Sequence, residues 1–452
     1  MGKTLWSGKV RKEVFEFTNS LPFDSELWRE DLDVTIAHAY ALYKAHIFNK
    51  REFDIILSSA QKVAKFIMEI KKKNLTSEYE DIHTLVEYSF KKFCGESLGG
   101  RLRAGRSRND QIVLDTRLFL IRKSIEIAKL INDVMNSIIV IADENFGKIG
   151  LSYTHTRRAQ PILFSHLFLS YLWALNKDIS RFLNFIKNCD ECPAGSGAIS
   201  GTSIPINPNH IAEYLGFSKI SSNSIESVST RDFCAEFLFI CAMCNINLSR
   251  ICEDIIIFST DEFGFFEIPE EFSTGSSMMP HKKNPDLFEL VRGKCGRTTG
   301  NLFALLTAVK GLPSGYSRDF QEDKERILDS ISNLTLSLKV VSEALKGLKV
   351  VKDLSDNSDK YVLSTDFAEE LFLRYKDYHR AHREVWRKLG SGEPIDSNVK
   401  TFRDSVRRKN TPQSTNPKFV RKQLNSAKKL TKKIEKELEK LSKRFESKIE
   451  KI

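Results

Sequence analysis

The stretch LDTRLFLIRKSIEIAKLINDVMNSIIVIA, residues 114–142, decides the fold. Its apolar residues return every three or four positions, beginning with Leu114, Leu118 and Ile121, which places them on one helix face. About 30 residues pass without a glycine or proline, which is longer than a typical globular helix. A helix of this length must bury its apolar stripe against other long helices, as happens in a helix bundle.

Three further segments repeat this helical pattern: residues 231–257, 285–309 and 324–347. Glycine, serine and proline gather at 190–208 and 267–285 and predict loops there, whereas strand patterns are scarce. We therefore predict a mainly α protein with a long central helix bundle. The expected domains are an N-terminal helical domain (1–111), the central bundle (112–350) and a small C-terminal helical domain (351–452).

The positive charge is confined to the C-terminal tail. The whole chain of 452 residues has a net charge of +11, and residues 401–452 contain 17 basic and 6 acidic residues, which also gives +11. The first 400 residues are therefore neutral, so we consider nucleic-acid binding by the tail less favoured than docking. An apolar stripe predicts an amphipathic helix that docks on the body or on a partner subunit: Leu430, Ile434, Leu438, Leu441, Phe445 and Ile449.

Composition narrows the class of protein further. The hydrophobic fraction of 41% excludes a mostly disordered chain. No run approaches the ~20 apolar residues of a membrane span, and the N-terminus lacks a leader pattern, so we expect a soluble cytoplasmic protein. Two CxxC pairs, Cys189/Cys192 and Cys241/Cys244, are too far apart for a usual zinc ribbon. We expect buried free thiols rather than a metal site.

Residues 273–286, STGSSMMPHKKNPD, form the most chemically informative segment, which we call the signature loop. Gly275, Ser276 and Ser277 combine backbone freedom with two hydroxyls. Lys282 and Asn284 then stand just before a predicted helix, and loop amides, a lysine charge and a helix N-terminus together suit an anion.

Two other segments concentrate polar side chains. GRSRNDQ, residues 105–111, stands at the start of the long helix, and its arginines suit carboxylates. SYTHTRRAQP, residues 152–161, places His155 beside Thr154. Glu289 could orient such a histidine and raise its basicity. Each of these segments alone would more often be an ordinary cap or a solvated turn.

Taken together, these motifs resemble the argininosuccinate lyases of the fumarase/aspartase superfamily. GSSMMPHKKNP is similar to the superfamily signature GSSxMPxKxNP, and DIHT (81–84), GRSRNDQ and GYSRDFQEDKE (315–325) resemble the argininosuccinate lyase branch. The resemblance implies a three-domain fumarase/aspartase-like fold and the reversible cleavage of argininosuccinate to arginine and fumarate. It also implies that no metal or organic cofactor is needed, and that a homotetramer shares its active sites between subunits.

The resemblance also implies roles for individual residues. Ser276 would be the base, His155 with Glu289 the acid or proton relay, and Lys282 a stabiliser of the developing negative charge. The expected substrate-binding residues follow from the same motifs: Ser20, Asp24, His83, Ser107, Arg108, Asn109, Thr154, Asn284, Tyr316, Gln321 and Lys324.

Two alternatives remain beside this interpretation. An adenylosuccinate lyase-like enzyme would share the signature loop, and a crystallin-like structural homologue would keep the fold without the activity. The family's usual C-terminal segment is not evident, so no substrate contact is assigned after residue 350.

Overall fold

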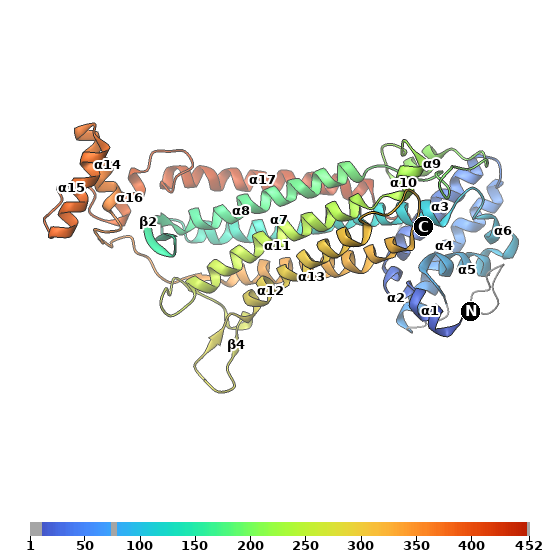
Figure 1. Cartoon of the computed structure of the whole chain (residues 1–452), viewed down its shortest axis with the longest axis horizontal. Helices are drawn as coiled ribbons and strands as arrows, with labels where there is room; N and C mark the ends of the chain where they lie inside the picture. The colour runs from blue at the N-terminus through green and yellow to red at the C-terminus, as the bar shows by residue number, and fades with distance from the viewer. Residues whose placement is uncertain (1–10, 74–78, 450–452) are drawn as a thin grey trace.

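The computed structural model describes residues 11–73 and 79–449 and is mainly helical (Figure 1). Long helices run along the long axis of the molecule, the N-terminal helices gather at one end, and short C-terminal helices lie at the other (Figure 1). The predicted helical class is therefore confirmed.

Six long helices form the central bundle. Helix α7 has 37 residues and contains the stretch that predicted it, and its first turn is closed by a capping box between Ser107 and Asp110. The three other predicted helical segments correspond to α11, α12 and α13. The six helices are α7 (Arg108–Glu144), α8 (Phe164–Cys189), α11 (Asp232–Phe258), α12 (Asp286–Val309), α13 (Glu322–Gly347) and α17 (Pro417–Arg444).

The N-terminal helices have a hydrophobic core of their own, in which Leu32, Ile56 and Phe90 are fully buried. The apolar residues of the bundle and of the C-terminal helices form a second, continuous core. The N-terminal elements are α1 (Lys12–Thr18), α2 (Leu21–Asp24), η1 (Ser25–Leu27), α3 (Trp28–Lys44), α4 (Lys50–Lys72), α5 (Ile82–Cys94) and α6 (Glu96–Arg101).

Short elements connect the long helices. The helical ones are α9 (Pro208–Leu215), α10 (Ser224–Ser229), η3 (Glu270–Phe272) and η4 (Arg318–Gln321). Three antiparallel strand pairs occur in the described residues: β1 (Ile149–Thr154) with β2 (Arg157–Leu163), β3 (Phe266–Glu267) with β6 (Lys349–Val350), and β4 (Thr274–Gly275) with β5 (Lys283–Asn284). Strands are scarce, as predicted, but the β1–β2 hairpin was not anticipated.

The basic tail docks on the bundle, as its apolar stripe predicted. Helix α17 packs along α7 and α8, with Ile434 and Leu438 buried. Its charged face makes ion pairs with the body, in which Arg421 and Lys428 both contact Asp143, at 2.7 and 2.6 Å. The docked helix therefore belongs physically to the bundle, although it follows the small C-terminal helices in sequence.

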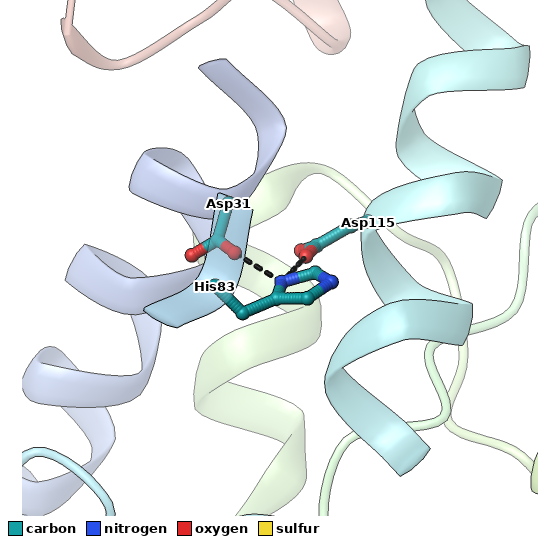
Figure 2. A group of neighbouring side chains, drawn as sticks. All are labelled: Asp31, His83 and Asp115. Carbon is teal, nitrogen blue, oxygen red and sulfur yellow. Dashed lines mark hydrogen bonds and ion pairs between the residues drawn. The ribbon is translucent and has the colours of Figure 1, made fainter. Parts of the chain in front are cut away.

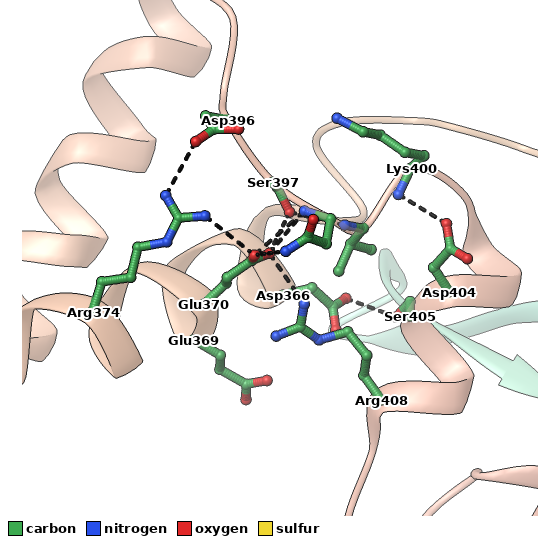
Figure 3. Close-up of polar contacts among 12 residues, drawn as sticks. Asp366, Glu369, Glu370, Arg374, Asp396, Ser397, Lys400, Asp404, Ser405 and Arg408 are labelled. Atoms are coloured by element: carbon green, nitrogen blue, oxygen red, sulfur yellow. Dashed lines mark hydrogen bonds and ion pairs between the residues drawn. The ribbon is translucent and has the colours of Figure 1, made fainter.

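The small C-terminal helices are joined by a polar network around Glu370 (Figure 3). The Glu370 carboxylate accepts hydrogen bonds from Ser397 at 2.6 Å and from the Asn398 side chain at 2.8 Å, and it pairs with Arg408 at 3.1 Å. These contacts lower the pKa of Glu370 against the opposing effect of its burial. Every partner belongs to this region, so the network stabilises α14 (Ser364–Tyr375) against α16 (Phe402–Arg408), next to α15 (Tyr378–Ser391).

One described helix, α11, is long and apolar enough to cross a membrane by length and composition alone. It packs against α8, α12 and α13, and its Cys241 and Cys244 are completely buried. A helix with this surrounding is a core helix of the bundle. All eight cysteines are free, and both CxxC pairs are buried, as expected.

Candidate active site

A buried polar cluster lies where the N-terminal helices meet the bundle. The Ser20 hydroxyl donates to Asp24 at 2.5 Å, and the other Asp24 oxygen accepts the backbone N–H of Ile82 at 3.1 Å. Burial raises the pKa of Asp24 to about 7, although the charge of Lys324 opposes the shift. The structure therefore brings together three residues that the sequence assigned to substrate binding, namely Ser20, Asp24 and Lys324.

Lys324 is held by two further buried groups that the sequence motifs did not single out. Its ammonium contacts Asp323 at 3.2 Å, and Asp323 accepts from Arg231 at 2.8 Å. The Arg231 guanidinium also stacks over the ring of Phe320, 4.5 Å from its centroid. Lys324 is only 6% exposed, so this chain of charges fixes its position.

The beginnings of α5 and α7 lie side by side at this cluster. Asp81 caps α5 by accepting from the backbone of Thr84 at 2.6 Å. Arg108, the first residue of α7, contacts Asp81 at 3.5 Å and the Thr84 hydroxyl at 3.4 Å. Ser107 is occupied as the cap of α7, and the Asn109 side chain donates to the carbonyl of Ala198 at 3.1 Å.

His83 lies one layer deeper, between two carboxylates that sequence reasoning missed. Its Nδ1 contacts Asp31 of α3 closely and Asp115 of α7 at 3.3 Å (Figure 2). Asp115 stands inside the apolar stripe that predicted α7. An acidic residue in a stripe expected to be buried was therefore the sequence signal that could have identified it. The three groups are close enough to bind one metal ion, but Arg106 and Arg108 already act on both carboxylates as positive charges.

Tyr316 and Gln321 stand at the edge of this cluster. The Gln321 amide donates weakly to the carbonyl of Thr18 at 3.5 Å, and Arg318 donates to the same carbonyl at 2.8 Å. Tyr316 is 39% exposed, with its ring near Phe320. Tyr316 is therefore exposed at this edge, and Gln321 is half-buried.

The signature loop projects from the bundle beside the label β4 in Figure 1. The short β4–β5 pair closes its base, where Thr274 pairs with Asn284. At its tip the Ser276 oxygen accepts two backbone N–H groups, from Met278 at 3.3 Å and Met279 at 3.0 Å. Lys282 is exposed, and so is most of the loop, with Met278 87% exposed.

His155 occupies the tip of the β1–β2 hairpin, which the sequence did not predict. It forms a two-residue turn with Thr156, and both have positive φ, at 51° and 57°. Such a turn usually takes asparagine and glycine, because a side chain at positive φ is strained. Strain of this kind is common at functional sites. Thr154 is also exposed at the end of β1.

The predicted catalytic residues make no direct polar contact with one another in the described part of the chain. Over residues 11–73 and 79–449, no hydrogen bond or ion pair joins any two of Ser276, His155, Lys282 and Glu289. The signature loop and the β1–β2 hairpin also lie far along the bundle from the N-terminal helices (Figure 1). A single chain therefore holds the parts of a site as separate pieces.

The long-helix bundle with a projecting signature loop defines the class of fumarase/aspartase-like lyases. The structure superposes on EDDS lyase in complex with formate with a TM-score of 0.83 at 24% identity, covering 97% of this chain and 93% of that one. It superposes on class II fumarase from Schistosoma mansoni with a TM-score of 0.68 at 15% identity, covering 82% and 86%. These likenesses establish the fold.

Sequence comparison identifies the family within this class. The Lyase family model matches residues 6–300. Argininosuccinate lyase of Geobacillus sp. is 42% identical over 393 residues, which is 85% of this chain and 84% of the relative. That of Bacillus anthracis is 36% identical over 459 residues, covering 95% and 98%. The chain belongs to the argininosuccinate lyase family and is by this homology a carbon–nitrogen lyase.

Proposed function

We propose that this enzyme cleaves argininosuccinate reversibly to arginine and fumarate, with Ser276 as the base. The observation that carries the assignment is the pair of backbone amides that donate to the Ser276 oxygen. A serine hydroxyl is a poor base unless its oxyanion is stabilised. Two N–H donors, together with the charge of Lys282 from the same loop, would supply that stabilisation.

The reaction proceeds by removal of a proton from the succinyl carbon next to a carboxylate. Ser276 takes this proton, and the electron pair delocalises into the carboxylate, whose second negative charge Lys282 and the loop amides stabilise. The electrons then form the fumarate double bond as the bond from carbon to the guanidinium nitrogen breaks. His155, oriented by Glu289 across a subunit boundary, donates the proton that the leaving nitrogen needs.

The remaining predicted residues divide into two binding groups. The first would hold the dicarboxylate part: His83, Ser107, Arg108, Asn109, Thr154 and Asn284. The second would hold the arginine part: Ser20, Asp24, Tyr316, Gln321 and Lys324. Support for this division comes from chemistry, because Arg108 offers a forked donor to a carboxylate and Asp24 an acceptor to a guanidinium.

We further propose a homotetramer in which different subunits complete each site. Apolar side chains remain exposed along α11, α12 and α13, among them Phe239, Phe303 and Leu336 at 48, 64 and 56%. On α12, Gly293, Gly296 and Gly300 face open space, since a Cβ on any of them would meet nothing within 4 Å. Small residues on one helix face allow another helix to approach closely.

A cytoplasmic location is also proposed. All eight cysteines are free, and six of them are buried, which agrees with a compartment that keeps thiols reduced.

The test of activity is fumarate release from purified protein, followed by ultraviolet absorbance. Argininosuccinate should be turned over, whereas adenylosuccinate should not. Turnover of adenylosuccinate alone would show that the chain is an adenylosuccinate lyase-like enzyme. Turnover of neither substrate would show that it is a structural homologue without the activity.

The test of shared sites mixes two inactive variants. Ser276→Ala and Arg108→Glu subunits should each be inactive or nearly so, because each lacks one half of every site. If the halves come from different chains, roughly a quarter of the sites in randomly mixed oligomers are intact, and activity returns. No recovery after mixing, in oligomers shown to exchange subunits, would contradict shared sites.

A further inference from the structure

The buried group formed by Asp31, His83 and Asp115 is only partly used by the proposed mechanism. It joins α3, α5 and α7, and the three residues are at most 2% exposed. The mechanism uses His83 as a substrate-binding residue and gives the two carboxylates no part. Two acids buried beside one imidazole need a reason, because burying charge costs free energy.

Asp31 has its hydrogen-bonding capacity filled. Its oxygens accept from the Gln111 amide at 3.1 Å each and from the Thr35 hydroxyl at 3.2 Å, in addition to Nδ1 of His83. Arg106 in turn donates to the Thr35 hydroxyl at 3.1 Å. Arg106 and Gln111 belong to the GRSRNDQ segment but have no role in substrate binding, so their contacts serve to hold Asp31.

Asp115 is the opposite case. Within the described part of the chain, neither of its oxygens has a hydrogen-bond partner, and its one ionisable neighbour within ion-pair distance is His83. Burial, together with the charges of Asp31 and Glu30, raises the pKa of Asp115 well above its usual value, against Arg106 and Arg108. A neutral carboxyl beside a fixed carboxylate is the arrangement that these surroundings favour.

The imidazole is thereby held in one orientation. Nδ1 faces both acids, and Nε2 lies on the far side of the ring (Figure 2). Nε2 is buried and has no hydrogen-bond partner among the described residues. Buried polar atoms nearly always have a partner, so this nitrogen is available to a partner outside the described residues.

We propose that Asp31 and Asp115 are positioning residues that hold His83 with Nδ1 inward, so that Nε2 is turned toward a polar group of the substrate. The proposal rests on the proposed function and adds to it the two acids that make His83 effective. A carboxylate that accepts from one ring nitrogen fixes the tautomer and the direction of the other.

The test compares Asp31→Asn and Asp115→Asn with Asp178→Asn as a matched control. Asp178 is equally buried but lies on α8, where it contacts Asn247 at 2.7 Å and Arg181 at 2.5 Å. In the two positioning variants we expect the KM for argininosuccinate to rise about tenfold or more, with kcat changed less than about threefold. The Asp178→Asn control should leave both constants close to those of the unmodified enzyme. Its melting temperature should change about as much as that of the two positioning variants.

A double-mutant comparison separates positioning from general destabilisation. In a His83→Gln background, Asp115→Asn should produce no further rise in KM, because both changes remove the same contact. An additional rise in that background, or equal KM values in Asp115→Asn and Asp178→Asn, would overturn the proposal. Since these comparisons use Asp115→Asn, the conclusion survives even if Asp31→Asn fails to fold.

Two further measurements complete the test. Failure of the unmodified enzyme to release fumarate would refute the proposed function, whereas normal activity with unaffected variants would refute only the positioning role. Metal analysis of the purified enzyme tests the remaining possibility, that Asp31, His83 and Asp115 bind a metal ion. One equivalent of a divalent metal that is lost in Asp115→Asn would show that the acids are metal ligands, and would overturn the proposal.

Discussion

The two halves of the candidate site differ in how much of their geometry one chain supplies. In the N-terminal cluster, Asp24, His83 and Lys324 are buried and bonded to neighbours from several helices. In the signature loop, Ser276 is held only by amides of its own loop, and Lys282 is exposed. The cluster is therefore organised by contacts within one chain, whereas most of the loop is exposed.

The substitution Ser276→Ala is the strongest test of this difference between the signature loop and the N-terminal cluster. Turnover should fall by about a thousandfold or more, because the proposed base is removed. The melting temperature should stay the same, since the loop packs against little. The activity assay and a thermal melt check both statements. The neighbouring Ser277→Ala serves as the control and should keep most of the activity, and equal losses in the two would contradict the assignment.

Phe445→Ala tests how much the C-terminal tail stabilises the region of the N-terminal cluster. Phe445 is 1% exposed, its ring lies 5.9 Å from that of Phe217, and its carbonyl accepts from Arg122. Loss of a buried ring should lower the free energy of unfolding by about 3–5 kcal/mol. Denaturant unfolding measures this loss. Phe419→Ala is the control, and its effect should be smaller because Phe419 is only half-buried.

Phe445→Ala should also speed hydrogen exchange in α3 more than in the signature loop. The tail backbone at Lys448 donates to Asp33 of α3, whereas the loop has no such cover. Equal effects on the two regions would show that the loop depends on the tail as much as the cluster does.

Asp24→Asn tests the electrostatic side of the cluster. The pKa of Asp24 is about 7 in the folded protein and 3.8 ordinarily, so the folded state holds the proton more tightly than the unfolded chain. Its stabilisation is complete below about pH 4 and is lost as the pH rises through 7. Between pH 5 and 8 the free energy of unfolding of the unmodified protein should fall by about 2–3 kcal/mol because of Asp24. The Asp24→Asn variant should not show this fall. Unfolding at both pH values measures the difference.

A parallel pH dependence in the two proteins would show that Asp24 does not titrate in this range. Asp54→Asn is a suitable control, because Asp54 forms an exposed pair with Lys50 on α4. It should leave the pH dependence unchanged.

The smallest expected effect comes from Asp143→Ala, at the other end of the docked tail. It removes the surface ion pairs to Arg421 and Lys428, which should cost less than about 1 kcal/mol because exposed pairs contribute little. Raising the salt concentration should shrink even this difference. A loss as large as that of Phe445→Ala would mean that charge, rather than apolar burial, holds α17 in place.

Much of the fold could be predicted because helix formation follows local rules. The apolar spacing in residues 114–142 predicted α7, and the GRSRNDQ segment was placed at its start, where α7 begins at Arg108. The tail's stripe predicted α17 and its docking, since an apolar face must be covered. The hairpin around His155 escaped prediction because its turn contains neither asparagine nor glycine, and only the surrounding structure holds those two residues at positive φ.

The sequence by itself determined the family, the long helices and the motif residues, because each is written within a few consecutive positions. Only the tertiary structure decided that Asp31, His83 and Asp115, which are distant in sequence, share one buried group, and that Arg231 and Asp323 hold Lys324. Such contacts depend on how helices pack, and helix packing is settled by burial over the whole chain rather than by local propensity. The same packing leaves His155 exposed and Ser276 half-buried, both far along the bundle from the N-terminal helices.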